Sequence, residues 1–195
     1  YLMKISTWNV NSVNARIEHL EKFIKKDQSD IYLLQELKTI EDGFPKEIIN
    51  NAGYYSYVNG QKAWNGVAIL SKEKLEITNT SIPKYDDPNA RFIETEIQLR
   101  KIKKNIKLIN IYLPNGNPIE TEKFDYKIEW MKKFNSYIQE LKDNNIPIII
   151  SGDFNVIPSD DDVYSPENFK NDACAHPLTR DQYRILINMG FTDLV

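Results

Sequence analysis

The chain has 195 residues, of which 41% are hydrophobic and 27% are charged, and its formal net charge is −3 at pH 7. These values are ordinary for a soluble globular domain. They exclude a protein that attracts nucleic acid through a large overall positive charge. Any phosphate-binding surface must therefore be a local patch, or a bound cation must neutralise the charge there.

Cysteine usage and hydropathy narrow the class further. The single Cys174 cannot form an internal disulfide, which favours a reducing cytosol. No apolar stretch approaches the length of a membrane span. We therefore expect a cytoplasmic protein with no membrane partner.

The first predicted elements form a strand–helix–strand unit. Residues 4–10 (KISTWNV) predict a strand, apolar residues recur at helical spacing over 17–24, and residues 30–35 (DIYLLQ) predict a buried strand. This order favours parallel pairing of the two strands.

The middle of the chain predicts short strands at 54–59, 66–71, 77–81 and 92–99, separated by Gly60, Gly66 and Pro83. No helix pattern is visible there, so we expect an antiparallel meander. Residues 100–107 (RKIKKNIK) are interpreted as a solvated hairpin turn in preference to a DNA-binding patch.

A second strand–helix–strand unit follows, with strands predicted at 106–113 and 146–151 and an amphipathic helix over 124–141. Residues 158–178 predict a surface loop. A last helix is expected to begin with a capping box of Thr179 and Gln182 and to end at Gly190. The two similar units indicate an α/β sandwich, with helices outside two packed sheets, in one domain over 1–195.

Polar residues interrupt the apolar strands at their carboxyl ends. The four ends read Trp8-Asn9, Gln35-Glu36, Tyr112-Leu113-Pro114-Asn115 and Gly152-Asp153-Phe154-Asn155. Open α/β sheets commonly bind ligands at the carboxyl ends of strands. Each residue alone has an ordinary structural interpretation: a turn for Asn9 or Asp153, a solvated acid for Glu36, a half-buried aromatic for Tyr112. Together the four ends favour a site.

The residue types at these ends suit a hard cation such as Mg²⁺, since carboxylates and amides are present and Cys and His are not. Glu36 is a candidate metal ligand, and Asp153 is a candidate ligand or base. Tyr112, Asn115 and Asn155 can donate hydrogen bonds to phosphate oxygens. Metal-assisted phosphodiester hydrolysis requires these parts.

Six ordered motifs resemble the exonuclease III family of apurinic/apyrimidinic (AP) endonucleases, within the endonuclease/exonuclease/phosphatase superfamily. They are STWNVNSVNARI (6–17), IYLLQELK (31–38), GQKAWNGVAIL (60–70), ARFIETEI (90–97), INIYLPNG (109–116) and SGDFNVIPSDDDV (151–163). The resemblance implies a four-layer α/β sandwich and a bound Mg²⁺, with Mn²⁺ as an alternative. It also implies a monomer in the bacterial cytosol or nucleoid that cleaves double-stranded DNA 5′ to abasic sites. Family members often act at 3′ ends as well, as exonucleases or phosphatases.

The resemblance also assigns roles to individual residues. Glu36 is the main metal ligand, Asn9 helps to hold metal or water, and Lys38 orients Glu36. Asp153 is the acid/base residue, and Tyr112 contacts the scissile phosphate or the attacking water. Phosphate and DNA contacts fall to Asn115, Asn155, Arg91 and Lys62. Leu37 stands where the family usually has Thr, and we expect little chemical loss because neighbours in a strand face opposite ways.

Two later motifs of the family do not occur: an Asp in an arginine-flanked strand, and a Ser-Asp-His motif whose histidine activates the nucleophile. The two histidines, His19 and His176, lack that context. We therefore expect a sandwich without its C-terminal portion, and weak or no activity of these 195 residues alone.

Two other functions are compatible with the sequence. One is another phosphoesterase of the same superfamily, acting on inositol phosphates or sphingomyelin-like lipids. The other is a non-catalytic remnant that binds DNA or a protein partner.

Overall fold

The computed structural model describes residues 3–99 and 104–194. These residues form two compact units. The first unit extends to Tyr112 and includes Pro147–Asp153, and the second contains Leu113–Ile146 and the residues from Phe154 onwards. The prediction of one domain stays a prediction. The hairpin turn predicted at 100–107 lies partly outside the described residues, which resume at 104.

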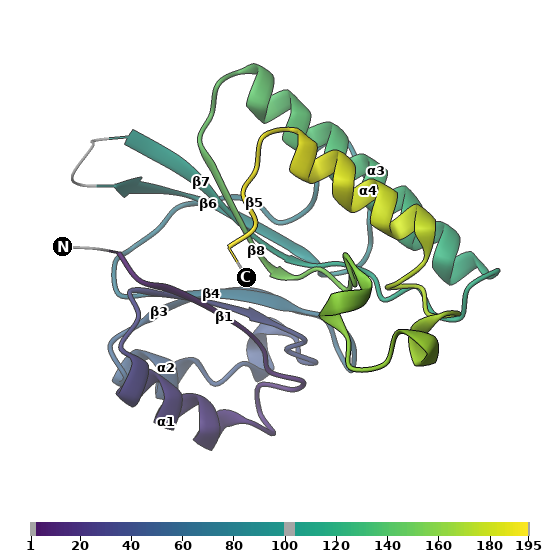
Figure 1. The fold of residues 1–195 in the computed structure, drawn as a ribbon. Coiled ribbons are helices and arrows are strands. Elements are labelled where there is room, and N and C mark those ends of the chain that lie inside the picture. Colours follow the sequence, from purple (N-terminus) through teal and green to yellow (C-terminus); the bar gives the residue numbers. More distant parts are fainter. Residues whose placement is uncertain (1–2, 100–103, 195) are drawn as a thin grey trace. The chain divides into compact units, whose positions relative to one another are not determined.

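The first unit contains two four-stranded mixed sheets (Figure 1). In the first sheet the strand order is β1 (Ile5–Asn9), β2 (Ile31–Gln35), β4 (Val67–Ser71) and β3 (Tyr55–Asn59). In the second sheet it is β5 (Ile77–Asn79), β6 (Phe92–Leu99), β7 (Lys104–Tyr112) and β8 (Ile148–Asp153). The pairs β1–β2 and β7–β8 are parallel, as the two strand–helix–strand units predicted.

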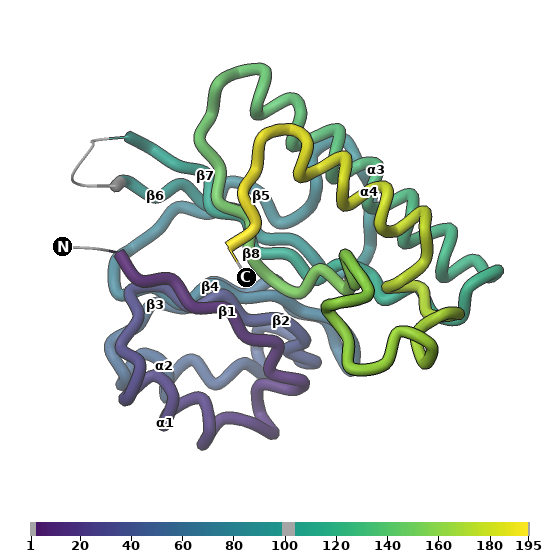
Figure 2. The backbone as a smooth tube through the Cα atoms, in the orientation of Figure 1, coloured from purple at the N-terminus to yellow at the C-terminus, as the bar shows by residue number. Residues whose placement is uncertain are grey.

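The single antiparallel meander predicted for the middle of the chain is wrong. β4 inserts between β2 and β3 in the first sheet, and the chain then changes sheets, so that β5 and β6 pair in the second (Figure 2). All five residues of β4 are buried, which suits a central strand, and its second neighbour is β2 and not β5.

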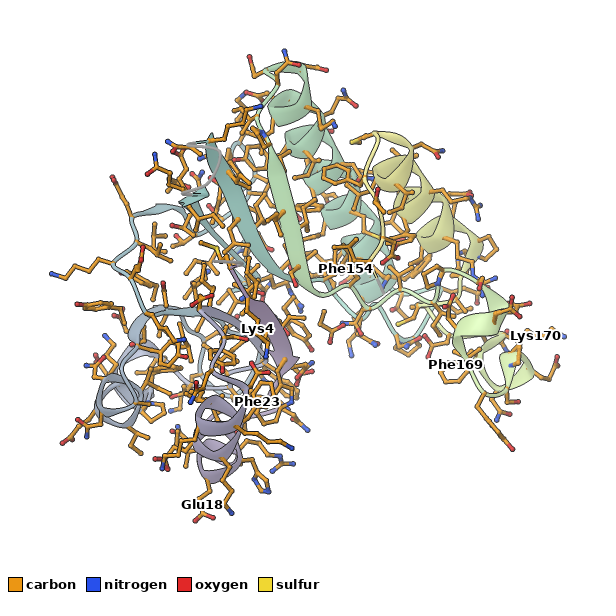
Figure 3. The ribbon with its side chains drawn as sticks, turned by 60° about the vertical axis from the view of Figure 1, so that its left-hand side comes forward. Lys4, Glu18, Phe23, Phe154, Phe169 and Lys170 are labelled. Atoms are coloured by element: carbon orange, nitrogen blue, oxygen red, sulfur yellow. The ribbon has the colours of Figure 1, made fainter. Side chains whose placement is uncertain are left out.

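Two helices cover the outer face of the first sheet: α1 (Ile17–Asp27) and α2 (Lys46–Asn51). Their buried residues Leu20, Ile24 and Ile49 join Tyr32 and Leu34 of β2 in one apolar cluster. Phe23 points from α1 toward the sheet, and Glu18 points away from it (Figure 3). α2 was not predicted, because six residues with one buried side chain are too few to produce a helical period.

The opposite face of β2 packs against the second sheet. Ile31 and Leu33 form an apolar layer with Ile106 and Leu108 of β7, together with residues of β4 and β6. Because β2 is buried on both faces, its sequence is a continuous apolar run and not an alternation. The observed class is therefore the predicted one, α/β with two packed mixed sheets and helices outside.

The second unit contains α3 (Glu122–Asp143) and α4 (Pro177–Asn188), which pack against each other (Figure 1). Short 3₁₀ turns occur at Glu41–Gly43 in the first unit, and at Asp160–Asp162 and Pro166–Phe169 in the loop of the second. Neither long helix has the apolar length to cross a bilayer, and the same is true of every other helix in the described ranges.

The predicted start of α4 is wrong. The N-cap is His176, whose Nδ1 accepts a hydrogen bond from the backbone N–H of Leu178, and Pro177 occupies the first turn. Proline is favoured there because its missing N–H has no partner to lose. Thr179 is instead a buried residue within the helix that donates to the carbonyl of Ala173. The predicted end is confirmed, since the helix stops at Asn188 and Gly190 follows with φ +96°.

Candidate active site

Four polar side chains of the first unit meet at the carboxyl ends of strands; we call Asn9, Glu36, Tyr112 and Asp153 the strand-end cluster. The amide nitrogen of Asn9 donates to Glu36 Oε1 at 2.9 Å and to Asp153 Oδ2 at 2.8 Å. The phenol of Tyr112 donates to the same Glu36 oxygen at 2.8 Å. Two carboxylates therefore converge on one neutral amide.

The strand register explains why these residues meet. Asn9 is the last residue of β1 and pairs with Gln35, which directly precedes Glu36. Tyr112 is the last residue of β7 and pairs with Asp153, the last residue of β8. Each pair comes from parallel strands, so its members end at the same edge of a sheet. The first sheet supplies one half of the cluster and the second sheet the other.

Gly152 makes the approach of β8 to β7 possible. A Cβ atom at this position would lie 2.0 Å from the carbonyl oxygen of Ile111, and the residue has φ +138°. Only glycine fits such a conformation and such a close contact. The glycine in Ser-Gly-Asp therefore belongs to the strand, where it sets the position of Asp153, and not to a tight turn.

The backbone after β2 turns sharply to present Glu36. Glu36 and Lys38 both have left-handed backbone angles, with φ +54° and +55°, which costs energy for residues with a side chain. Hydrogen bonds hold the turn, from the backbone N–H of Leu37 to Gly66 and from that of Lys38 to Asn65. Strained backbone that its surroundings hold in place is common at functional sites.

Lys38 and Leu37 point in different directions from this turn. The Lys38 ammonium lies 3.1 Å from Glu36 Oε2, which is the contact that an orienting role requires, and it also donates to Asn11. Leu37 is fully buried in the apolar cluster beneath the first sheet. It follows β2 and is not part of it, so alternation along a strand does not apply here, and the expected small chemical effect of Leu37 stays a prediction.

Electrostatics keep Glu36 ionised and Tyr112 protonated. Burial raises the pKa of Glu36, but hydrogen bonds from Asn9, Tyr112 and Lys38 outweigh it, so the net pKa lies below its usual value. Burial, and then the hydrogen bond to Glu36, raises the pKa of Tyr112 far above its usual value. Near neutral pH the phenol is therefore a hydrogen-bond donor and not a base.

Arg91 lies on Tyr112. Its guanidinium carbon is 5.0 Å from the centre of the phenol ring, and Nη1 donates to the carbonyl of Tyr112 at 3.2 Å. The backbone N–H of Tyr112 in turn donates to the carbonyl of Arg91. The structure thus places a fifth predicted residue against the strand-end cluster.

The donor set fits a hard divalent cation. Within residues 3–99 and 104–194, no three acidic, histidine or cysteine side chains gather into a metal-binding group. Mg²⁺ does not need three, because it binds through one or two carboxylates and keeps several waters. Glu36 and Asp153 supply two. The oxygen of Asn9 accepts from the backbone N–H of Asn11, so its amide nitrogen is the group that faces both acids.

Two further predicted residues, Asn115 and Asn155, lie together in the second unit. Asn155 has φ +45° and donates from its amide to the carbonyl of Leu113 at 2.8 Å. The amide of Asn115 is exposed and lies 3.5 Å from the side-chain oxygen of Asn155.

Lys127 holds the two segments that carry these amides, and it was not predicted from the sequence. Its ammonium, fully buried on α3, donates to the carbonyls of Pro114 at 3.0 Å and Asn155 at 2.6 Å. A signal was available, because position 127 falls on the apolar face marked by Phe124 and Met131, where lysine is unexpected.

The remaining candidates do not join either group. Lys62 is exposed in the loop before β4. His19 is exposed on α1, as its position in the helix predicted. His176 caps α4 and packs edge-on against Phe124, with ring centres 4.5 Å apart, so it has a structural role.

Comparison with known proteins identifies the family. Residues 6–193 match the model of the endonuclease/exonuclease/phosphatase family. Exodeoxyribonuclease III of Haemophilus influenzae is 34% identical over 98% of this chain and 74% of its own length. An AP endonuclease from Archaeoglobus fulgidus has a TM-score of 0.90 at 33% identity, covering 98% of this chain and 72% of the other.

A third relative, a 3′ phosphatase from Neisseria bound to a product DNA hairpin, has a TM-score of 0.89 at 32% identity, with 98% of this chain and 73% of the other covered. The matches extend over nearly the whole chain, and the fold agrees with that of the solved structures. The chain therefore belongs to the endonuclease/exonuclease/phosphatase family, with hydrolases of the exonuclease III and AP endonuclease type among its relatives.

Proposed function

We propose that this protein is a DNA repair nuclease that hydrolyses the phosphodiester bond 5′ to an abasic site in double-stranded DNA. The single observation that carries this proposal is the amide of Asn9, which holds Glu36 and Asp153 together beside a protonated Tyr112. The motif set and the relatives support the proposed substrate: exodeoxyribonuclease III and an AP endonuclease are among them.

The residues of the strand-end cluster and the other candidate residues each have a role in the proposed reaction. Asp153 accepts the proton of the attacking water. Tyr112, whose phenol stays protonated, turns its single O–H from Glu36 to the phosphate when DNA binds. Arg91, stacked on Tyr112, binds a DNA phosphate. Asn115 and Asn155 donate to phosphate oxygens, and Lys62 contacts the DNA backbone.

Glu36 would hold a divalent cation, with Mg²⁺ or Mn²⁺ as the metal, and Asn9 would help to hold the cation or its water. When bound, such a cation stabilises the negative charge that develops on the phosphate. Lys38 keeps the Glu36 carboxylate in its present orientation through their 3.1 Å contact.

We further propose that the 195 residues incise slowly when alone, because neither histidine belongs to the cluster: His19 is exposed on α1 and His176 caps α4. The proposal also includes exonuclease and 3′-phosphatase activity at DNA 3′ ends, a monomeric state and a cytoplasmic location. A relative described as a 3′ phosphatase bound to product DNA supports the activity at 3′ ends.

The test is an incision assay with the protein in excess over a duplex that carries one abasic site, with Mg²⁺ and with EDTA. We expect slow cleavage on the 5′ side of the site that EDTA abolishes and that Asp153→Asn removes. Fast cleavage would support the reaction but refute slow incision by the chain alone. Hydrolysis of an inositol phosphate or sphingomyelin with no cleavage of abasic DNA would contradict the proposed substrate. Mg²⁺-independent binding without incision would identify a non-catalytic protein.

A further inference from the structure

We propose that a buried pair, Gln35 of β2 and Asn110 of β7, positions the two halves of the strand-end cluster by fixing the spacing and register of the two sheets. Neither residue can touch substrate, because the exposed fractions are 1% and 0%. The inference rests on the proposed function, because it assigns the pair a role through Glu36, Asn9 and Asp153.

The cluster depends on the alignment of two separate sheets. Asn9 and Glu36 come from the first sheet, and Tyr112 and Asp153 come from the second. Both hydrogen bonds that join the halves, Asn9 to Asp153 and Tyr112 to Glu36, cross from one sheet to the other. A small slip between the sheets would lengthen both bonds, and active-site geometry tolerates only small displacements.

The side chains packed between the two sheets change from apolar to polar toward the strand-end cluster. On the inner face of β7, Ile106 and Leu108 are apolar, and Asn110 and then Tyr112 are polar. These residues are two apart and so point to the same side. β2 shows the same change, because its inner residues Ile31 and Leu33 are followed by Gln35.

Next to the strand-end cluster, hydrogen bonds replace apolar packing between the two sheets. Gln35 Nε2 donates to Asn110 Oδ1 at 2.7 Å and to Thr7 of β1 at 3.0 Å. Asn110 Nδ2 donates to the carbonyls of Leu34 at 3.0 Å and Ala68 at 2.9 Å, and these two residues are register partners in β2 and β4. One side chain of the second sheet therefore binds two strands of the first, and through Gln35 is linked to a third.

The physical consequence is a fixed register. Apolar side chains tolerate small shifts because dispersion has little directional preference, whereas a buried hydrogen bond that is stretched or bent loses most of its energy. Asn110 lies two residues before Tyr112, and Gln35 lies directly before Glu36. The Gln35–Asn110 pair therefore lies in the buried layer next to the strand-end cluster. From there it transmits the alignment of the two sheets to the cluster.

The test compares Asn110→Leu with a matched control, Thr95→Val. Thr95 is also fully buried in the second sheet, but its hydroxyl donates to Glu76 and does not cross to the first sheet. Both variants should lower the melting temperature. The discriminating readout is the side-chain amide resonance of Asn9, followed by NMR during titration with MgCl₂ alone.

We expect Asn110→Leu to shift the Asn9 amide resonance and to weaken Mg²⁺ binding about tenfold, the lower end of the effect of outer-shell residues on metal affinity. Thr95→Val should change neither. Gln35→Met, which leaves the two carbonyl contacts of Asn110 in place, should show the same changes to a smaller extent, and it serves if Asn110→Leu does not fold.

If the Asn9 resonance and the Mg²⁺ affinity are unchanged in both Asn110→Leu and Gln35→Met, the inference is overturned. The pair would then be a purely stabilising contact. Equal changes in Thr95→Val would overturn the inference too, because loss of stability alone would then explain them. The resonance readout does not require catalysis. If the wild-type protein failed to cleave abasic DNA, the proposed function would fail while the positioning role would still be tested.

Discussion

The carboxylates at the two ends of the first sheet are held in different ways. At the amino-terminal ends of β1 and β2, Asp27 accepts hydrogen bonds from Lys4 at 2.6 Å and from Ser6 and Ser29. Nearby Asp30 lies 3.6 Å from Lys72. Each acid at this end has its own lysine, so charge is balanced pair by pair.

At the carboxyl ends Glu36 also has a lysine, Lys38, whose ammonium lies 3.1 Å from Oε2. Here, however, Glu36 and Asp153 share the neutral amide of Asn9 as well, and Tyr112 adds a second neutral donor. The backbone at Glu36 is left-handed, whereas Asp27 is the last residue of a regular helix. The neutral donors orient the two acids and add no positive charge to that of Lys38, which suits a site that takes up a cation. The comparison predicts that acids at one end serve catalysis and those at the other serve stability.

The largest effect is expected for Asp153→Asn. An amide cannot accept the proton of the attacking water, so the single-turnover rate of abasic-site incision should fall by about 10³-fold, within the range for loss of a general base. The matched control is Asp27→Asn at the amino-terminal end of the first sheet, which should retain the rate within about twofold because it is remote from the site. Equal losses in the two variants would remove the distinction between the ends.

Glu36→Gln should have the next largest effect. Replacing the carboxylate lowers the affinity for a divalent cation, and we expect incision at low Mg²⁺ to fall by about 10²-fold, as for other changes at metal sites. High Mg²⁺ should restore part of the rate. Glu47→Gln, on the exposed surface of α2, is the control. A loss that no Mg²⁺ concentration reduces would argue against a metal-binding role for Glu36.

Lys127→Met tests the amides of the second unit. The change removes the donor to the carbonyls of Pro114 and Asn155, so the segments that carry Asn115 and Asn155 should loosen. We expect affinity for abasic DNA, measured by fluorescence anisotropy in Ca²⁺, to fall about tenfold, the equivalent of one charge-assisted hydrogen bond.

The control for this variant is Lys132→Met, which removes the same charge from the exposed side of α3. A second control is Lys127→Met in the Asn155→Ala background, where the further loss should be small if Lys127 acts through Asn155. Equal losses of affinity in Lys127→Met and Lys132→Met would mean that only net charge matters.

The sequence predicted those parts of the site that interrupt a pattern visibly. An acid directly after a buried strand stands out, so Glu36 and Asp153 were found together with the parallel strands that carry them. Asn110 and Lys127 were not found, because a single polar residue inside an apolar pattern has no local sign of its partners. Their partners are carbonyls far along the chain, such as those of Ala68 and Asn155.

The fold shows the same limit. Local patterns located both parallel units, but whether β4 pairs with β2 or continues a meander depends on packing between distant segments. The capping-box spacing at Thr179 was real, yet Pro177 and the side chain of His176 started the helix earlier. The local capping-box pattern misplaced the start of the helix because neighbouring residues provide a better N-terminus.

The smallest effect is expected for Asp27→Asn. It should lower the free energy of unfolding and leave the rate of incision intact. The hydrogen bond from Lys4, and then that from Ser29, hold the pKa of Asp27 well below its usual 3.8, although burial opposes them. Its side chain is 17% exposed. We expect a loss of about 1–2 kcal/mol in the free energy of unfolding at neutral pH, typical of hydrogen bonds to a charged group.

The pH dependence gives this prediction its sign. Because the pKa is lower in the folded state, the stabilisation is complete above the unfolded value near 3.8 and is lost as the pH falls through the folded value. Urea unfolding of wild type and Asp27→Asn should therefore differ by a constant amount from neutral pH down to about pH 4, with the gap closing in stronger acid. A gap that widened on acidification would mean that Asp27 is not held as an anion, and the contrast between the two ends of the sheet would then have to rest on geometry alone.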